Sequence, residues 1–351
     1  MATPSLNRST QLNPRIEWID IAKAYGIIAI VLGHILTGTP IAHFLYWWHV
    51  PLFFILSGIF IKPLNNRHAW HRFFLRRVRN ELILYSLMGV LLIWGYTLIH
   101  HESHTFLVNH LVDLIYGGRT LNFYTSTFWF INAYILTTIV ITILVSVIHS
   151  RIIAGALVTS GLFLGASYNQ VTWMHINGFA MTPWSADTVL ITAFYSYVGY
   201  VLFHTNQSWI EDPKAISGII VMAMTLILIH LNGGFTFRLS LKSHLIQSSL
   251  PNAMALIIIP TILALGVMVG ALITSKLPFK FGLPLIGRHT LAIMYGHKMI
   301  LDVCGLIGIK NPLFQLLLGI CIPVIIVVAC EKIRSLDGHL LNRNSGHGYL
   351  K

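Results

Sequence analysis

The stretch Ile16–Leu36 reads IEWIDIAKAYGIIAIVLGHIL, and two of its properties decide the fold. It is apolar over about 20 residues, the length of a helix that crosses the hydrocarbon core of a bilayer. It also carries four ionisable side chains, those of Glu17, Asp20, Lys23 and His34. Ionisable groups inside a membrane are costly and by default mark function. The stretch therefore predicts a membrane helix that carries part of a functional site.

The whole chain has the composition of an integral membrane protein. Hydrophobic residues make up 55% of its 351 residues and charged residues only 10%, whereas a soluble domain has about 25% charged residues. This composition argues against a soluble enzyme, a disordered chain and a nucleic-acid-binding domain. The three cysteines lie in apolar stretches without a CxxC spacing, which indicates neither a metal site nor disulfides.

Apolar windows along the chain predict ten membrane-spanning helices, so we expect an all-α polytopic membrane protein. The windows are roughly 16–36, 43–61, 81–99, 127–148, 152–168, 187–204, 214–231, 251–275, 285–304 and 313–330. The predicted domains are an N-terminal cytoplasmic segment 1–15, a ten-helix domain 16–330 and a cytoplasmic tail 331–351. The first window lacks a cleavage site and contains charges, so we interpret it as a retained helix rather than a signal peptide.

The net charge of +12 is largely explained by topology. When successive connections are assigned to alternate sides, 17 of the 23 Lys and Arg residues lie on one side. Cytoplasmic loops collect Lys and Arg, so both termini are expected in the cytoplasm. The opposite side has only four basic residues, Arg119, Arg238, Lys242 and Lys310.

The three longest connections, 100–126, 169–186 and 232–250, are all expected outside. They are nearly uncharged but rich in histidine and tryptophan, with His100, His101, His104, His110, Trp173, His175, Trp184 and His244. Such a surface could bind a neutral sugar. A generic interfacial belt explains the tryptophans equally well.

The charged residues of the first span share one helix face. Asp20 and Lys23 are three residues apart, hence neighbours. Lys23 and His34 are eleven apart, which returns to the same face after three turns at roughly 16 Å. The stripe is either functional or a buried Asp20–Lys23 pair with a hydrogen-bonded core histidine.

The second span begins outside, so His49 is expected at a depth comparable to that of His34. Pro51 can kink the helix beside this histidine. An interfacial position is an equally good interpretation of His49. Ser57 and Gly58 allow a close helix approach, which favours a packing role for Ser57.

A basic cluster precedes the third span. Six basic residues lie within 62–79, including Arg72, Arg76, Arg77 and Arg79, more than topology requires. Arginine suits phosphate recognition, so the cluster could bind a soluble phosphorylated donor. It could equally bind anionic lipid.

The ninth span contains a second group of ionisable residues. His297 is another candidate intramembrane imidazole. Lys298 and Asp302 are four residues apart, so they could neutralise each other.

Together these residues resemble the membrane acyltransferase-3 family, and most closely its fucose 4-O-acetylase-like branch of sugar O-acetyltransferases. The resemblance covers essentially the whole chain. It is carried by Trp18–Lys23 followed by Val31–His34, by His49–Gly58, by the basic run Arg76–Arg79, by Thr127–Phe130, and by Ile286–Leu291 with His297. The broad family commonly has arginine eleven residues before the histidine. Lys23 stands there in this chain, as in the sugar-acetylase branch, and offers a point charge rather than a bidentate fork.

The resemblance implies an O-acyltransferase of the bacterial cytoplasmic (inner) membrane. Acetyl would pass from cytoplasmic acetyl-CoA to a hydroxyl of an envelope polysaccharide or of its lipid-linked precursor. The resemblance implies no bound cofactor, no metal ion and no nucleic-acid partner. The implied catalytic residues are His34, Lys23 and Asp20. The donor would be bound by Arg72, Arg76, Arg77 and Arg79. A second set of site residues comprises His49, Ser57, Trp129 and His297.

Other function classes stay open at this stage. A transporter or flippase for a glycan lipid or small solute would also have many spans and intramembrane charges. No pair of matching Gly/Pro-broken spans indicates the repeats common in transporters. A purely structural scaffold leaves Asp20, Lys23 and His34 unexplained. The acceptor glycan and the length of the acyl group are not identified by the sequence.

Overall fold

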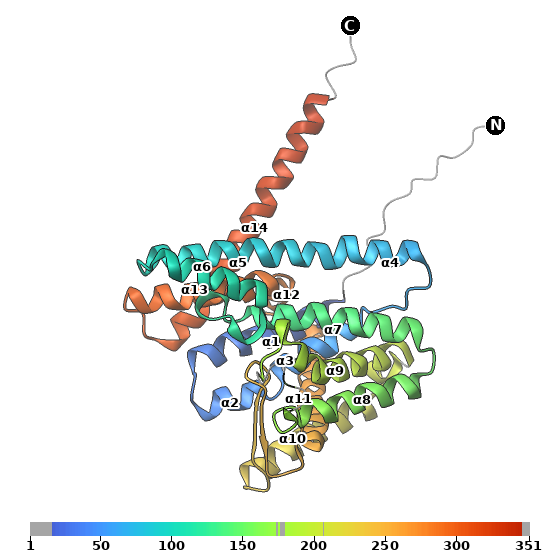
Figure 1. Cartoon of the computed structure of the whole chain (residues 1–351). Helices are drawn as coiled ribbons and strands as arrows, with labels where there is room; N and C mark the ends of the chain where they lie inside the picture. Colours follow the sequence, from blue (N-terminus) through green and yellow to red (C-terminus); the bar gives the residue numbers. More distant parts are fainter. Residues whose placement is uncertain (1–15, 173–174, 176–179, 206, 346–351) are drawn as a thin grey trace, which may run out of the picture.

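The apolar windows of the sequence form helices that pack into a bundle (Figure 1). The computed structural model describes residues 16–172, 175, 180–205 and 207–345. The predicted N-terminal segment 1–15, the end of the tail at 346–351 and Trp173 lie outside the described residues. Residues 331–345 continue the last helix, which extends away from the other helices in Figure 1.

Eight predicted spans correspond to continuous helices. These are α1 (Glu17–Ile35), α5 (Arg79–Ile99), α7 (Phe128–Val147), α8 (Arg151–Ala166), α9 (Ala186–Thr205), α10 (Pro213–Leu231), α11 (Asn252–Ser275) and α14 (Pro312–Ser345). The two remaining spans are interrupted, as α2 (Pro40–Tyr46) with α3 (His49–Gly58), and as α12 (Leu283–Arg288) with α13 (Thr290–Leu306). In the second span the break lies at Trp47 and Trp48, ahead of Pro51.

The described residues contain eight helical stretches that are long and apolar enough to cross a membrane. Helices α8, with 16 residues, and α13, with 17, are shorter than these stretches. The all-α polytopic fold is confirmed. The count of ten spans and the cytoplasmic termini stay predictions.

Short elements connect the long helices. They are α4 (Arg67–Phe73), α6 (His104–Tyr116), the π-helix η1 (Phe74–Val78), and the 3-10 helices η2 (Gly118–Thr120), η3 (Phe123–Thr125), η5 (Pro183–Ser185) and η6 (Gln207–Ile210). A hairpin of β1 (Phe237–Ser240) and β2 (Leu245–Ser248) is the one β-sheet among the described residues. In its antiparallel register Phe237 lies opposite Ser248. The sequence prediction missed this hairpin, although Phe237 and Leu239 alternate inward with exposed Arg238 between them.

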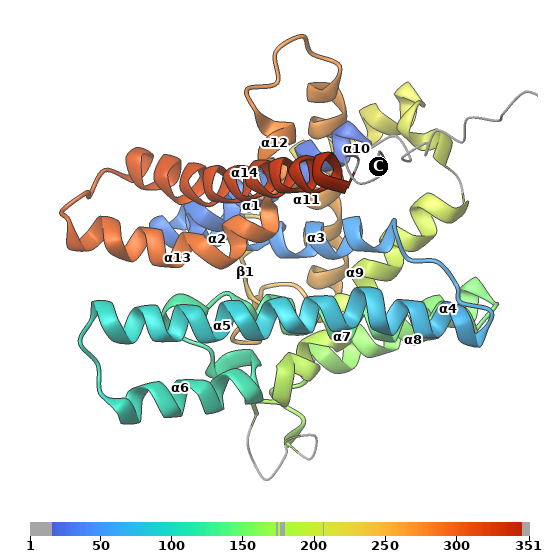
Figure 2. The ribbon, with the colours of Figure 1, turned by 90° about the horizontal axis from the view of Figure 1, so that it is seen from above.

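Helix α1 lies in the middle of the bundle and contacts α2, α3, α11, α12, α13 and α14 (Figure 2). Its side chains are apolar on most sides, and Ile21, Ala22, Ile27 and Val31 are fully buried. Of its ionisable residues, Asp20 is buried, whereas Glu17 and Lys23 are partly exposed.

Two glycines allow α3 and α9 to touch through their backbones. A Cβ atom on Gly58 would lie 1.9 Å from the carbonyl oxygen of Ser196, and one on Gly199 would lie 1.8 Å from that of Ile55. Ser57 bonds the hydroxyl of Ser196 across the same contact, at 3.2 Å. The close approach expected at Ser57 and Gly58 is therefore present, and α9 is the partner helix.

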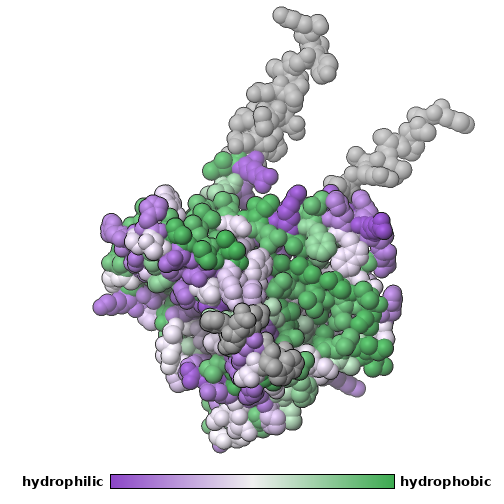
Figure 3. All heavy atoms as spheres, viewed as in Figure 1, coloured by the Kyte–Doolittle hydropathy of each residue, from purple (hydrophilic) through white to green (hydrophobic). Residues whose placement is uncertain are grey.

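The outer surface of the bundle is widely apolar (Figure 3). Helix α10 has no buried residue along its length, although it is strongly apolar. The hydrophobic face in Figure 3 lies where Figure 1 shows α7, α8 and α9. Exposed side chains there include Val140, Ile143, Val147, Ile152, Ile153, Leu157, Phe163 and Leu164. A surface of this kind suits lipid contact.

Candidate functional site

Three cavities follow one another along α1. The inner cavity, about 250 Å³, is lined by Lys23, and the central cavity, about 310 Å³, is lined by His34. Phe130 and Met294 line both of these cavities, so they form the wall between them. The outer cavity, about 380 Å³, shares His34 and Lys298 with the central one. The three cavities thus lie in series beside α1, with Phe130 and Met294 between the inner and the central one.

His34 lies at the junction of the central and outer cavities, next to His297 of α13. The centroids of the two rings are 5.3 Å apart. His297 is fully buried, and its Nδ1 donates a hydrogen bond to the carbonyl of Ile293 at 2.7 Å. This leaves Nε2 of His297 as an acceptor in the neutral ring. Within the described residues this Nε2 has no hydrogen-bond partner. The structure thus makes His297 a direct neighbour of His34.

His49 lines the central cavity together with His34. It is buried, and its Nδ1 donates to the carbonyl of Leu45 at 2.7 Å. This bond leaves Nε2 with the lone pair in the neutral ring. The hydroxyl of Tyr46, beside the ring of His49, donates to the carbonyl of Gly33 at 3.2 Å. These contacts connect α2 and α3 to the turn of α1 that carries His34.

Asp20 and Lys23 lie at the other end of α1. Lys23 lines the inner cavity, and its Nζ is 3.5 Å from Asp20 Oδ1. Because α1 is unbroken, the eleven residues from Lys23 to His34 still span roughly 16 Å. The structure therefore brings neither Lys23 nor Asp20 into contact with His34.

At this end of α1, Asp20 pairs with basic side chains and packs against α12. It is buried, lies 3.6 Å from Arg288 Nε and lines none of the three cavities. Its backbone touches α12 so closely that a Cβ on Gly287 would lie 1.7 Å from the Asp20 carbonyl oxygen. The pairing of Asp20 with two cations corresponds to the buried-pair interpretation of the stripe.

The basic run lies on α4, η1 and the start of α5. The side chains of Arg72, Arg76 and Arg79 are exposed. Arg77 differs, since its Nη2 donates to the hydroxyl of Tyr134 at 3.1 Å and its Nε lies 3.7 Å from Glu81.

Tyr134 and Glu81 both line the inner cavity. Arg77 is therefore the member of the run that the structure connects to this cavity. The segment Phe74–Val78 is a π-helix, a distortion that is frequent at functional sites.

The expected Lys298–Asp302 ion pair is wrong. Asp302 Oδ2 instead accepts hydrogen bonds from Tyr124 at 2.6 Å and from His100 Nε2 at 2.7 Å. Both donors come from other elements, η3 and the end of α5, and they outcompete the neighbour on the same helix. Lys298 is left facing the central and outer cavities.

Among the lining residues that the sequence does not assign to the site are Lys242, Lys298, Glu81 and Tyr134. The sequence shows an intramembrane lysine at 298, but its spacing of four residues from Asp302 predicts a neutralised pair. Lys242 was counted only as an outer-loop charge. It reaches the site because the hairpin folds over the central cavity, whose lining includes Leu239, Ser240, Leu241 and Lys242.

The remaining predicted residues, Ser57 and Trp129, line cavities but also pack within the bundle. Ser57 lines the inner cavity, but its hydroxyl donates to the carbonyl of Phe54 at 2.7 Å. Trp129 lines the central cavity and is buried. Among the described residues, no group of three or more His, Cys, Asp and Glu side chains is placed to hold a metal ion.

The sequence model of one protein family matches the chain over residues 16–332. It describes the acyltransferase domain of the acyltransferase-3 family. The match includes all three cavities and every residue named above as lining them. No curated protein and no solved structure matches the chain.

Proposed function

The chain belongs to the acyltransferase-3 family of membrane acyltransferases, and from this premise we propose a specific reaction. It transfers acetyl from cytoplasmic acetyl-CoA to a hydroxyl of an envelope polysaccharide or of its lipid-linked precursor. The enzyme is a sugar O-acetyltransferase of the bacterial inner membrane. The observation that carries the proposal is that the cavity lined by Lys23 and the cavity lined by His34 are neighbours, with only Phe130 and Met294 lining both.

The donor is bound at the inner end. The phosphates of acetyl-CoA lie against the exposed arginines Arg72, Arg76 and Arg79, because guanidinium groups match phosphate geometry. Arg77 contacts the wall of the inner cavity through Tyr134. The uncharged arm of the donor occupies this cavity, whose walls are mainly apolar. Lys23 contributes a point charge there.

The thioester crosses the wall of Phe130 and Met294 to reach His34. The imidazole of His34 accepts the proton of the acceptor hydroxyl as the oxygen attacks the thioester carbonyl. The tetrahedral intermediate then expels the thiolate of coenzyme A, which takes up the proton. The products are an acetyl ester and free coenzyme A. A transient acetyl-His34 is the alternative route, with the same proton balance.

His34→Ala tests the assignment. It should abolish acetylation of envelope glycans, measured by mass spectrometry, without lowering the amount of protein in the membrane. His104→Ala is the matched control, because His104 is exposed and lines none of the three cavities. Near-normal acetylation in the His34 variant would refute the role of His34.

A second measurement separates acetyl transfer from transport. Membranes that contain the protein should release acetyl from labelled acetyl-CoA onto glycan, and membranes without it should not. Movement of a glycan lipid across the membrane without any acetyl transfer would instead indicate a flippase.

A further inference from the structure

Two lysine side chains line the central cavity with His34. Lys242 comes from the turn of the hairpin and Lys298 from α13. The other polar side chains along the wall are hydroxyls and imidazoles, those of Thr37, Tyr46, Ser126, Thr127, Ser240, His34 and His49. In the part of the chain that the structure describes, no Asp or Glu lines this cavity. The wall of this cavity therefore has basic groups and no acidic group, while Asp302 shares only the outer cavity with Lys298.

Neither ammonium group has a carboxylate within 4 Å in the described ranges. Lys242 Nζ donates one hydrogen bond, to the carbonyl of Leu121 at 2.7 Å. Asp302 lies in the outer cavity and is already bonded to Tyr124 and His100. An ammonium group has three protons to donate, and its burial without a counter-charge is costly. The cavity is therefore suited to an anionic ligand.

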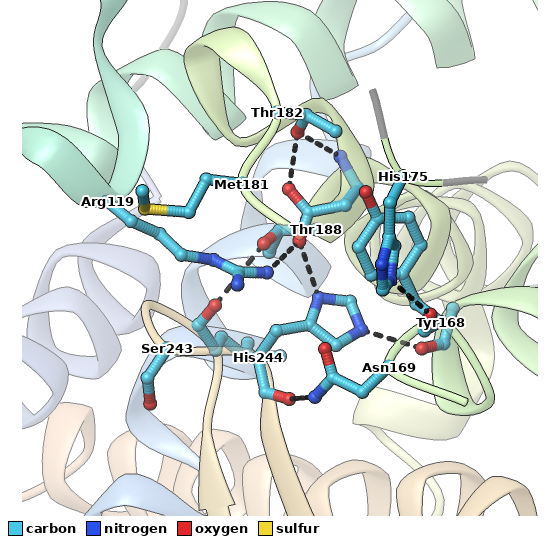
Figure 4. Close-up of polar contacts among 12 residues, drawn as sticks. Arg119, Tyr168, Asn169, His175, Met181, Thr182, Thr188, Ser243 and His244 are labelled. Carbon is cyan, nitrogen blue, oxygen red and sulfur yellow. Dashed lines mark hydrogen bonds and ion pairs between the residues drawn. The ribbon is translucent and has the colours of Figure 1, made fainter. Parts of the chain in front are cut away.

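The hairpin that carries Lys242 is anchored in the protein interior by His244 (Figure 4). Nδ1 of His244 donates to Asp187 Oδ2 at 2.7 Å, and Nε2 donates to the carbonyl of Gly165 at 2.6 Å. Arg119 pairs with the same carboxylate oxygen of Asp187. Both nitrogens of a buried ring are thus used to hold the turn of the hairpin in place.

Two further hydrogen bonds hold the main chain on either side of Lys242. The hydroxyl of Thr188 donates to the carbonyl of Leu241 at 3.2 Å. The side-chain amide of Asn169 donates to the carbonyl of His244 at 2.7 Å. Lys242 therefore projects from a fixed backbone, and such preorganisation lowers the entropic cost of binding a ligand.

The charge of Lys242 is sensitive to pH near neutrality. Burial, and then the charge of Lys298, lowers the pKa of Lys242 to about 8. At pH 7 the side chain is mostly protonated, and a bound anion would stabilise this charged form. As pH rises through the pKa, the charge is lost and an anion is held less tightly.

We propose that the central cavity binds the acceptor through a carboxylate or phosphate group, held between Lys242 and Lys298 beside His34. The inference rests on the proposed function, because it names the class of acceptor used at the same site. It replaces the neutral sugar expected from the outer loops with an acidic sugar or a sugar phosphate. The bound anionic group would present a neighbouring hydroxyl to His34.

Ligand-observed NMR on the purified full chain in detergent tests the proposal without acetyl-CoA. The probes are glucuronate, glucose 1-phosphate, glucose and the methyl ester of glucuronic acid. At least one of the two anions should bind roughly tenfold more tightly than both neutral sugars, as expected for a hydrogen bond to a charged group. The preferred anion distinguishes carboxylate from phosphate. Equal binding of all four probes, or no binding of either anion, would overturn the proposal.

Single-lysine variants locate the binding. Lys242→Gln and Lys298→Gln should each weaken the binding of the preferred anion by roughly tenfold. Lys310→Gln is the control. Lys310 is exposed, is predicted on the same side of the membrane and lines none of the three cavities. Unchanged binding in the double variant of Lys242 and Lys298 would contradict the inference.

The pH profile gives an independent measurement. The charged or titratable groups that share this cavity with Lys242 are Lys298 from α13, His34 from α1, Tyr46 from α2 and His49 from α3. In the wild type, binding of the anion should weaken as pH rises from about 7 to about 9, because Lys242 loses its proton. Lys242→Arg keeps its charge over this range, so the weakening should move to higher pH. Identical profiles for the two proteins would show that Lys242 does not hold the anion.

The binding experiments need no acyl transfer, so the two proposals can fail separately. If the lysine variants lose anion binding while His34→Ala still acetylates glycans, only the proposed role of His34 fails. If His34→Ala abolishes acetylation while neutral and anionic probes bind alike, only the acceptor class is wrong.

Discussion

At the scale of single residues, Arg77 differs from its neighbours in the basic run. Arg77 bonds Tyr134 and lies near Glu81 at the inner cavity, whereas Arg76 is exposed. Arg77→Ala should therefore raise the KM for acetyl-CoA by roughly tenfold, since it removes a charge held beside the donor. Arg76→Ala should have a smaller effect that shrinks as salt screens the exposed charge.

Steady-state kinetics of the purified protein at low and high ionic strength would measure both effects. Arg76→Ala serves as the matched control, because it removes the same charge from the same segment. An unchanged KM in Arg77→Ala, accompanied only by altered lipid association, would favour the lipid-binding interpretation of the run.

The same scale shows what sequence reasoning can find in the site. Asp20, Lys23 and His34 stand out because charge is rare in an apolar helix. In the structure, however, Lys23 and His34 line different cavities, and Asp20 lines neither and pairs with Lys23 and Arg288. The contacts that define the centre come from far away in the chain, as His34 beside His297 and Tyr124 beside Asp302 show. Helix periodicity contains no information on such pairs.

At the scale of elements, the contact of α3 with α9 is a test of the fold. Gly199→Ala would place a methyl group against the carbonyl of Ile55, where no side chain can move aside. The two helices must then separate, so we expect a thermal midpoint lower by several degrees and less folded protein in the membrane.

Gly270→Ala in α11 is the control, because a Cβ there meets no atom within 4 Å. Alanine favours a helix over glycine by roughly 0.5–1 kcal/mol, so this variant should be at least as stable as the wild type. Size-exclusion chromatography and thermal unfolding in detergent measure both variants. Equal stability of the two would mean that the α3–α9 contact can relax.

The elements themselves divide into those that the sequence predicts and those that it does not. Long apolar windows gave all the principal helices, because length and hydropathy are local properties. The break at Trp47–Trp48 lies beside the kink predicted at Pro51, which cannot donate to the carbonyl four residues earlier. The sequence does not predict the break at His289. The sequence does not predict the hairpin, because 232–250 has the composition of an aromatic outer loop. Its strands are short, and buried anchors such as His244 hold its turn.

At the scale of the whole molecule, the orientation predicted from the basic residues agrees with the order of the cavities along α1. Arg77 of the basic run contacts Tyr134 and Glu81, which line the inner cavity, and the predicted topology places this end of α1 in the cytoplasm. The hairpin, predicted outside, lies over the central cavity at the His34 end. In the proposed reaction the cytoplasmic donor and the external acceptor meet within the protein, after the thioester crosses the wall between the inner and central cavities.

Met294 is the residue that tests this crossing. It is buried and lines both cavities with Phe130, and methionine adapts its shape easily. Met294→Phe should narrow the route with a rigid ring, lowering kcat by roughly tenfold or more while the KM for acetyl-CoA changes little. Steady-state kinetics of acetyl transfer measure the two parameters separately.

Two comparisons make this result specific to the route. Met224→Phe adds the same ring on the exposed face of α10 and should leave kcat unchanged. Binding of the anionic probe at Lys242 should survive in Met294→Phe, since that site lies beyond the wall and is filled from the other side. If kcat falls together with anion binding, the substitution has distorted the central cavity. If kcat does not fall at all, the thioester reaches His34 by another path, and the series of cavities along α1 is not the route of the acetyl group.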